Sequence, residues 1–284
     1  MKAAEAVERL HGGEVTDLRA SGGSVFLAVL ADGEVVVAKR GSGAGATTAE
    51  AAGLAWLGEH GDVRVPTVYG HDDEWIILRY VRPGVPSKRA AEELGRGLAR
   101  LHLRGAPAFG SPPPGGPVDA WMGMAPMRNQ AHPDWPTFYA EHRIRPYVRM
   151  CLDQGLFTTE EAATFDRLGE RLPELAPREP PARLHGDAWS GNVHWSDDGA
   201  WLIDPAAHGG HREGDLAMLQ LFGTPQLDRI LGAYAESAEP PLAGGWRDRV
   251  ELHQLFPLLM HAAVFGGGYV RQALNAARKS LRLP

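Results

Sequence analysis

One segment in the second half of the chain constrains the fold more than any other. A polar loop runs from His185-Gly186-Asp187 to Asn192, and two apolar runs follow it, separated by Asp197-Asp198-Gly199. A short turn that ends in glycine joins antiparallel strands. With Asp198 at the tip of a three-residue turn, Asn192 falls opposite Asp204. We therefore expect a β-hairpin that brings Asn192 and Asp204 to one end, beside Asp187.

The polar groups of this hairpin suit phosphoryl transfer. Taken singly, each could be an ordinary turn residue, because Asp, Asn and Gly are common in loops. Together they have the spacing of a kinase catalytic loop followed by a metal-binding aspartate. Amide and carboxylate oxygens are ligands that Mg²⁺ accepts when it carries nucleotide phosphates. We therefore predict Asp187 as the catalytic base, Asn192 and Asp204 as Mg²⁺ ligands, and ATP as the phosphoryl donor.

An upstream segment carries the lysine that such a site requires. Residues 35–39, Val-Val-Val-Ala-Lys, have the β-branched composition of a strand. Side chains alternate along a strand, so Val37 and Lys39 share one face. We expect Val37 to contact adenine and Lys39 to contact the α- and β-phosphates. Without the downstream loop, Lys39 would be read as a charge that protects an edge strand from aggregation.

The helix expected after this strand offers a partner for the lysine. Glu50 lies on the same helix face as Leu54 and Leu57. It could close a capping box with Thr47. Its position on the apolar face instead favours an inward direction, and we expect an ion pair with Lys39 that orients the ammonium for the nucleotide.

Two glycine-rich stretches could lie over the phosphates. Gly22, Gly23 and Ser24 fall between two expected strands before Lys39, where a phosphate loop belongs, whereas residues 41–45 are interpreted as a flexible connector. Neither stretch matches the Walker pattern, and no G-x-G-x-x-G follows a strand, which disfavours P-loop and dinucleotide folds. Ser190 lacks the first glycine of G-x-S-x-G, so a hydrolase nucleophile is excluded as well.

These motifs resemble the fructosamine/ketosamine-3-kinase family, within the aminoglycoside-phosphotransferase-like kinases. HGDAWSGN at 185–192 is similar to the family's HGDLWSGN, and IDPAAHGGHREGDLAMLQLFG at 203–223 is similar to IDPAxxxGHREADLAMxxLFG. Residues 255–269 resemble its last helical segment, and residues 135–149 resemble its substrate-side helix. The likeness thus extends along nearly the whole chain. Ala188 replaces the loop leucine, and Arg79 replaces a glutamate usual in the hinge.

The resemblance implies an α+β, bilobal, protein-kinase-like fold. We expect a small antiparallel-sheet N-lobe with one helix at residues 1–82 and a larger, mainly helical C-lobe at residues 83–284, with the site between them. Helical periodicity predicts helices at 90–103, 136–154, 159–172, 215–235 and 247–279. Residues 105–116, dense in Gly and Pro, are expected to be a loop.

The resemblance also implies an activity and further site residues. The activity is ATP-dependent phosphorylation of the 3-hydroxyl of free or protein-bound ketosamines, a deglycation repair. Tyr80 and Val81 would meet adenine, and His185 and Asp215 would support the catalytic loop, although Asp215 could also cap a helix. Trp189 and Arg143 would contact the substrate.

Charges on the expected substrate-side helix bear on the kind of acceptor. Arg143, Arg145 and Arg149 face only Glu141 there. A basic wall favours a neutral sugar or a carboxylate-bearing substrate over a polycationic aminoglycoside. A kinase for an aminoglycoside, choline or another small alcohol remains an alternative, as does a nucleotide-binding pseudokinase.

Bulk properties agree with a soluble enzyme. The net charge of −6 over 284 residues gives no electrostatic case for nucleic acid. A single cysteine, Cys151, fits a reducing cytoplasm. No apolar run is long enough to span a bilayer, so no membrane partner is expected. We expect a monomer or homodimer in the cytoplasm. His208 and His211 are expected to be structural rather than metal ligands.

Overall fold

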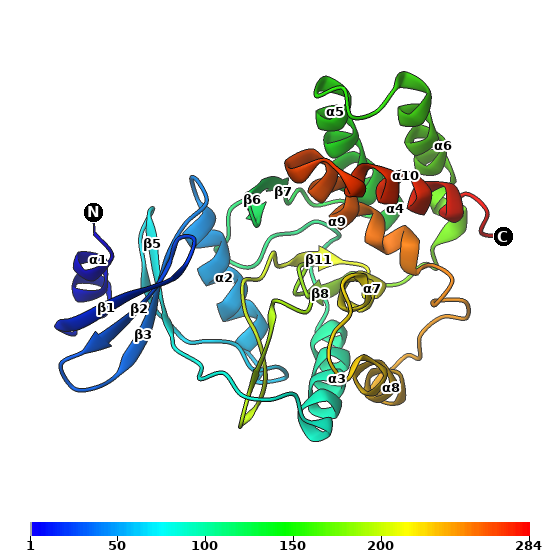
Figure 1. Cartoon of the computed structure of the whole chain (residues 1–284). Helices are drawn as coiled ribbons and strands as arrows, with labels where there is room; N and C mark the ends of the chain where they lie inside the picture. The colour runs from blue at the N-terminus through cyan, green and yellow to red at the C-terminus, as the bar shows by residue number, and fades with distance from the viewer. Residues whose placement is uncertain (1) are drawn as a thin grey trace.

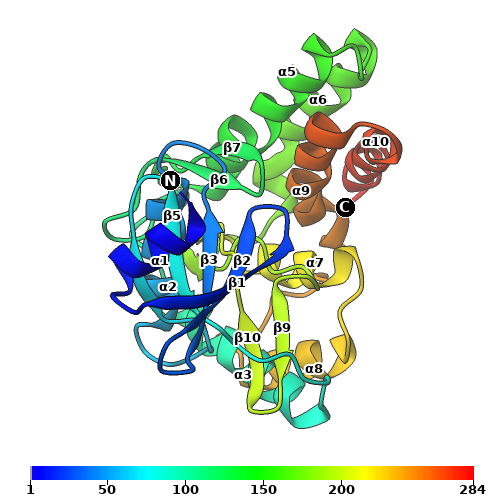
Figure 2. The same cartoon turned by 60° about the vertical axis from the view of Figure 1, so that its left-hand side comes forward.

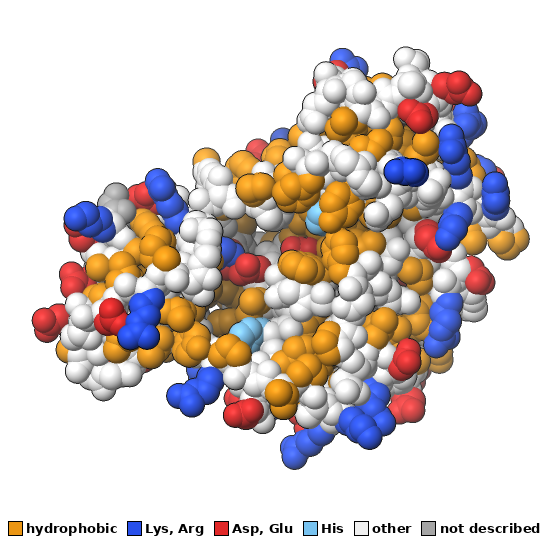
Figure 3. Space-filling view, in the orientation of Figure 1, with side chains coloured by type: hydrophobic (Ala, Val, Ile, Leu, Met, Phe, Trp, Pro, Cys, Tyr) orange, Lys and Arg blue, Asp and Glu red, His pale blue; other side chains and the backbone are white. Residues whose placement is uncertain are grey.

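The computed structural model describes residues 2–284 and has the expected α+β architecture. A five-stranded antiparallel sheet with two helices forms a small N-terminal lobe, and the rest of the chain forms a larger lobe of helices and short hairpins (Figure 1). The space-filling view shows a hollow between the two lobes, with acidic and basic side chains inside it (Figure 3).

The sheet of the small lobe has the order β1-β2-β3-β5-β4. Its strands are β1 (Val15–Gly22), β2 (Val25–Leu30), β3 (Val35–Arg40), β4 (Val68–His71) and β5 (Trp75–Arg79). The central strand β3 pairs with β2 and β5, so that Lys39 lies between Val25 and Ile76. Both neighbours of β3 are strands, so its lysine cannot be a charge that protects a sheet edge.

Alternation along β3 sends its side chains to two different helices. Val36 and Ala38 pack with α1 (Ala3–Leu10) in one apolar cluster. Val37 points to the opposite face, where α2 (Ala46–Gly58) contributes Leu54. The expectation of one helix in this lobe was wrong: α1 supplies the second. Its signal in the sequence is the spacing of Ala3, Ala6 and Val7, which places all three on one helix face.

The large lobe begins with α3 (Lys88–Leu103), whose first turn is capped by the Ser87 hydroxyl, an acceptor for the Ala90 N–H. Its other helices are α4 (Trp135–Phe138), the π-helix η1 (Tyr139–Ile144), α5 (Arg145–Asp153), α6 (Thr159–Leu175), α7 (Glu213–Leu221), α8 (Leu227–Ser237), α9 (Val250–Phe265) and α10 (Gly268–Ser280). Helices α5, α6, α9 and α10 gather at one end of the lobe, and α3 and α8 lie together at the other (Figures 1 and 2). Within residues 2–284, no helix combines the length and apolar character needed to cross a bilayer.

Two of the expected helices are each divided in two. The segment 215–235 is interrupted between α7 and α8, where Gly223 has φ +72° and Pro225 follows. The segment 247–279 is interrupted at Gly266 and Gly267, with φ values of +63° and +59°. Backbone with positive φ cannot continue a right-handed helix. Apolar periodicity runs through both breaks, which is why it suggested single helices.

Three two-stranded antiparallel sheets complete the fold. They are β6 (Asp119–Met122) with β7 (Ala125–Arg128), β8 (Ala182–Leu184) with β11 (His208–Gly210), and β9 (Val193–Ser196) with β10 (Gly199–Leu202). The β9–β10 hairpin is the one expected from the sequence. The β6–β7 hairpin was not expected, because Met and Ala side chains in four-residue strands give little β-signal.

The register of the β9–β10 hairpin differs by one residue from the expected one. Ser196 pairs with Gly199, so the turn has two residues and not three. Asn192 therefore accepts a hydrogen bond from the Ile203 N–H at 3.1 Å, and Asp204 follows one position later. Gly199 is the first residue of β10, and Arg64 lies so near that a β-carbon at this position would come within 2.7 Å of the Arg64 Nε. The end of the hairpin still brings Asn192 and Asp204 together.

Candidate active site

The side chains predicted for phosphoryl transfer line one pocket of about 290 Å³ between the lobes. Strand β3 and helix α2 contribute Lys39 and Glu50, and the catalytic loop with the end of β10 contributes Asp187, Asn192 and Asp204. These five residues come from three separate stretches of the sequence. The fold therefore brings all five side chains together on one pocket.

Lys39 is held by two carboxylates. Its Nζ lies 2.9 Å from Glu50 Oε2 and 2.8 Å from Asp204 Oδ1, which confirms the predicted ion pair with Glu50. Burial lowers the pKa of Lys39, but the charges of Glu50 and Asp204 outweigh this effect and raise the pKa above its usual value. Burial also raises the pKa of Glu50 to about 7, against the opposing effect of Lys39. The lysine is thus a fixed positive charge at the pocket floor.

Asp187 is held by the amide of Asn192. The Asn192 Nδ2 donates to the Asp187 carbonyl oxygen at 2.8 Å and to Asp187 Oδ2 at 3.0 Å. Burial raises the pKa of Asp187 well above its usual value, and the negative charge of Asp204 acts in the same direction, while the Asn192 hydrogen bond opposes both. A carboxylate with a raised pKa is a better proton acceptor, as a general base requires.

Asp204 has an unusual backbone conformation. Its φ is +51°, in the left-handed region that Asp and Asn tolerate better than most residues. Its carboxylate is 42% exposed towards the pocket. The Asn192 Nδ2 also lies 3.4 Å from the Asp204 carbonyl oxygen, and because this amide donates through Nδ2, its Oδ1 remains available as an acceptor. One amide oxygen and one carboxylate form a hard oxygen donor set, which fits Mg²⁺.

A buried network fixes the loop that carries Asp187. The carboxylate of Asp215 accepts hydrogen bonds from the His185 N–H at 2.7 Å and from the Gly186 N–H at 2.8 Å. These two hydrogen bonds are the contacts by which Asp215 was predicted to support the catalytic loop. Burial opposes ionisation of Asp215, but His102, 3.2 Å away, overcomes it and lowers the pKa. The His185 Nε2 lies 3.0 Å from the Ile203 carbonyl oxygen, which ties the loop to the residue before Asp204.

Sequence reasoning missed two members of this network. His102 is buried on α3, and its Nδ1 lies 2.8 Å from the hydroxyl of Tyr234 on α8. The only sequence signal was a polar residue on the apolar face of an amphipathic helix, because Tyr234 lies 132 residues away from His102.

The predicted phosphate loop occupies the β1–β2 turn. Gly22 and Gly23 are exposed, and the Ser24 carbonyl accepts from the Arg40 N–H at 3.0 Å, so the turn lies at the Lys39 end of the sheet. These three residues do not line the pocket described above, and their role in phosphate binding stays a prediction.

The glycine-rich connector after β3 is part of the pocket wall. Gly41 and Ser42 line the pocket, together with Trp121 from β6. The Trp121 Nε1 donates to the Ala44 carbonyl at 3.0 Å, and a β-carbon on Gly43 would come within 2.3 Å of the Trp121 ring. Residues 41–45 join β3 to α2, as predicted for a connector, and the Trp121 indole packs on the backbone at Gly43.

The predicted adenine-contact residues follow β5. The Val81 carbonyl oxygen lies 3.0 Å from the His194 Nε2 on β9, which joins the lobe connection to the catalytic hairpin. Tyr80 and Val81 remain predicted nucleotide contacts through other backbone groups. The side chain of Arg79, at the end of β5, lies over the Trp201 ring at 5.3 Å.

The two predicted substrate residues have different positions. Trp189 lines the pocket and is 37% exposed, with its ring edge-to-face against Phe222 at 5.7 Å. Arg143 is only 1% exposed and donates to the Arg128 carbonyl at 2.8 Å and to Asn129 Oδ1 at 2.7 Å. Burial lowers the pKa of Arg143 to about 10. Arg143 therefore holds the interior of the large lobe together, and the prediction that it contacts substrate is corrected.

The prediction of a basic pocket wall, made from Arg143, Arg145 and Arg149, is therefore also wrong. Arg145 and Arg149 on α5 are exposed; Arg145 lies 4.0 Å from Glu141 on the adjoining η1, and Arg149 lies 3.0 Å from Asp153 on α5. The charged side chains that do line the pocket are one lysine and three carboxylates, from Glu50, Asp187 and Asp204. The electrostatic argument against a cationic acceptor therefore no longer holds.

Comparisons with known proteins identify relatives of this chain. A family model described as fructosamine kinase matches residues 3–282. The chain is 34% identical over 239 residues to a probable ketoamine kinase of Escherichia coli, which covers 82% of this chain and 79% of that protein. A crystal structure from Thermobifida fusca with the provisional name fructosamine-3-kinase superposes with a TM-score of 0.91 at 44% identity, over 99% of both chains. A spectinomycin phosphotransferase in complex with ADP and spectinomycin shares the fold, with a TM-score of 0.60 at 13% identity over 99% of this chain and 97% of that one.

Proposed function

The chain belongs to the fructosamine kinase family, and we propose that it transfers the γ-phosphoryl group of ATP to the 3-hydroxyl of a ketosamine. The observation that carries this proposal is the convergence of the Lys39–Glu50 ion pair with Asp187, Asn192 and Asp204 on one pocket. A phosphotransferase needs a cation for the phosphates, oxygen ligands for a metal and a base for the hydroxyl, and the pocket offers all three.

Each residue would have a defined task. Lys39 binds the α- and β-phosphates, and Glu50 keeps its ammonium directed into the pocket. Asn192 and Asp204 would hold Mg²⁺, which neutralises charge on the phosphates when bound. Asp187 orients the acceptor hydroxyl and accepts its proton, while the Asn192 amide keeps the carboxylate in place. The β1–β2 turn with Gly22, Gly23 and Ser24 would cover the phosphates, and Val37, Tyr80 and Val81 would meet the adenine.

The walls beside Asp187 suit a sugar that carries an amine. Trp189 and Trp121 present indole rings, and Met124, 64% exposed at the tip of the β6–β7 hairpin, adds a flexible thioether. The CH faces of a sugar can stack on such rings while its hydroxyls reach the carboxylates. A ketosamine also carries a protonated amine, which the excess of carboxylates in the pocket favours. Phosphorylation at the 3-hydroxyl would make the ketosamine break down and free the amine, a deglycation.

The substrate assignment predicts a ranking of acceptors. On family resemblance, we expect ATP-dependent phosphorylation of ribulose- and fructose-modified lysine, with the ribulosamine preferred, and little phosphorylation of kanamycin or choline. ADP release and the mass of the product measure this, and the Asp187→Asn protein controls for contaminating kinases. Efficient phosphorylation of kanamycin or choline with unmodified ketosamines would overturn the substrate assignment. Tight ATP binding without any phosphorylated acceptor would favour a pseudokinase.

The lysine and its partner should differ in how strongly they affect ATP. Lys39→Ala removes charge-assisted hydrogen bonds of about 1.5–3 kcal/mol, so kcat/KM for ATP should fall by about 10- to 100-fold. Glu50→Gln should cost less than about tenfold, because Asp204 still holds the ammonium at 2.8 Å. Steady-state kinetics with varied ATP tests the order. Lys88→Ala, at an exposed lysine on α3, is the matched control. A larger loss in Glu50→Gln than in Lys39→Ala would contradict these roles.

A further inference from the structure

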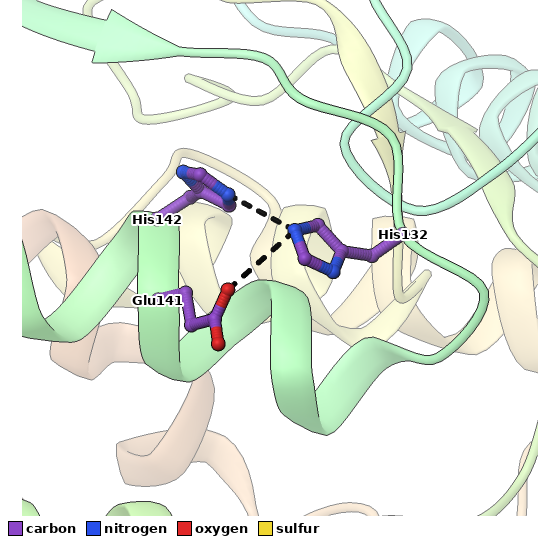
Figure 4. Close-up of side chains that lie close together, drawn as sticks. All are labelled: His132, Glu141 and His142. Atoms are coloured by element: carbon purple, nitrogen blue, oxygen red, sulfur yellow. Dashed lines mark hydrogen bonds and ion pairs between the residues drawn. The ribbon is translucent and has the colours of Figure 1, made fainter.

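A second cluster of possible ligands lies outside the catalytic pocket. His132 stands before α4, and Glu141 and His142 are consecutive residues of the π-helix η1 (Figure 4). The His132 Nε2 lies 3.0 Å from the His142 Nε2 and 3.7 Å from Glu141 Oε2. One ligand atom from each residue falls within 4.8 Å of the others. Figure 4 shows the His142 ring and the Glu141 carboxylate both directed at the same nitrogen of His132.

These separations are close to those that a transition metal requires. A tetrahedral Zn²⁺ about 2.0–2.1 Å from each ligand atom holds those atoms roughly 3.3 Å apart. The two observed distances from His132, 3.0 Å and 3.7 Å, bracket that spacing, so small side-chain rotations would suffice. Two imidazoles and one carboxylate also form a donor set that suits zinc and leaves a fourth position for water.

The backbone places the three side chains without a metal. A π-helix has more than four residues per turn, so consecutive residues diverge less around its axis than in an α-helix. Glu141 and His142 can therefore both face His132. The His132 N–H donates to the Phe109 carbonyl at 2.8 Å, which fixes the other side of the cluster. The site is thus built from two segments that are each held in place.

A neighbouring arginine favours a position of the Glu141 carboxylate in which one oxygen faces His132. Arg145 Nη1 lies 4.0 Å from Glu141 Oε1, which leaves Oε2 directed at His132. A hydrogen bond between the two rings accounts for one nitrogen of each, but it does not engage Glu141, whose oxygen stands 3.7 Å away.

We propose that His132, Glu141 and His142 form a binding site for a divalent transition-metal ion, with Zn²⁺ as the best fit. The site is separate from the catalytic pocket, since none of these three residues lines it. A bound ion would join the segment before α4 to the π-helix. Arg143, the residue after His142, donates to the Arg128 carbonyl at the end of the β6–β7 hairpin. A bound ion would therefore also make the attachment of this hairpin, which carries Trp121 and Met124, more rigid.

Zinc binding to the full-length, metal-stripped protein tests the proposal. Isothermal titration with Zn²⁺ is done in millimolar Mg²⁺, so that Mg²⁺ competes for the oxygen ligands proposed in the catalytic pocket. We expect one Zn²⁺ per chain and a higher Tm with zinc. His132→Ala should weaken binding by more than about 100-fold, since loss of outer-shell partners alone costs 10- to 100-fold. Glu141→Gln, at a side chain 44% exposed, should weaken it as well and is expected to leave the zinc-free Tm unchanged.

The matched control is His60→Ala. His60 lies 3.5 Å from Glu59 on the surface, a pair with one histidine and one carboxylate but no third ligand. This variant should bind zinc like the unmodified protein. Absence of 1:1 binding in the unmodified protein would overturn the proposal. Binding that survives both His132→Ala and Glu141→Gln would do so too, because the ion would then lie elsewhere, for example at the buried cluster of His211, Glu213 and His253.

Discussion

Replacing Asp187 with Asn should lower kcat by about 10²–10⁴ and leave ATP affinity nearly unchanged, because a positioned base contributes that much to the rate. The substitution keeps the shape of the side chain, and its amide oxygen can still accept from the Asn192 Nδ2, which lies 3.0 Å from Asp187 Oδ2. It removes only the ability to take the proton. The raised pKa of Asp187, caused mainly by burial, is what makes this carboxylate a capable base.

The measurement separates chemistry from binding and folding. The rate is taken at saturating ATP and ketosamine, nucleotide affinity is measured with a fluorescent ATP analogue, and Tm reports the fold. Asp198→Asn is the matched control, at the tip of the same hairpin, where Oδ1 accepts from the Trp201 indole. Asp187→Ala should lower kcat more than Asp187→Asn does, because the Asn192 amide also loses a side-chain acceptor. Near-normal kcat in Asp187→Asn would remove Asp187 from the mechanism.

The parts of the site that the sequence predicted correctly depend on short-range periodicity. Lys39 and Val37 share a strand face by alternation, and Glu50 lies on the inward face of the next helix. The hairpin placed Asn192 and Asp204 at one end even though its register was wrong by one residue. The one-residue error in register did not change this outcome, because Asn192 and Asp204 both lie beyond the last strand pair. The two segments that carry them meet at that end of the hairpin in either register.

The parts that were missed depend on contacts between distant segments. Arg143 was predicted to contact substrate, yet its guanidinium lies over Phe138 at 4.5 Å and over Phe256 at 5.1 Å, and the second ring is over a hundred residues away. A π-helix shifts the exposed face relative to α-helical spacing, so periodicity could not show that Arg143 points inward. The packing of Trp121 on the connector at residues 41–45 is likewise a contact between segments that are distant in the sequence.

Asp204→Asn should reduce Mg²⁺-dependent turnover by at least about 10³-fold, since metal coordination supplies several kcal/mol of charge stabilisation and 1.36 kcal/mol corresponds to tenfold in rate. Asn is a cleaner replacement than Ala. The backbone at Asp204 has φ +51°, which Asn tolerates, whereas Ala would add a cost of roughly 1–2 kcal/mol to the fold. The Asn variant thus removes a charged ligand without backbone strain.

The variant also tests how Asp204 divides its carboxylate between Lys39 and the metal. Asp204 Oδ1 lies 2.8 Å from the Lys39 Nζ, and a bound Mg²⁺ would compete with the ammonium for that oxygen. Rates over a series of Mg²⁺ concentrations should show a higher Mg²⁺ requirement and a lower maximum in Asp204→Asn, while Glu50→Gln, which alters the other partner of Lys39, should leave the Mg²⁺ requirement unchanged. An unchanged Mg²⁺ profile in Asp204→Asn, or a rate loss that follows a lowered Tm, would show that Asp204 is not the metal ligand.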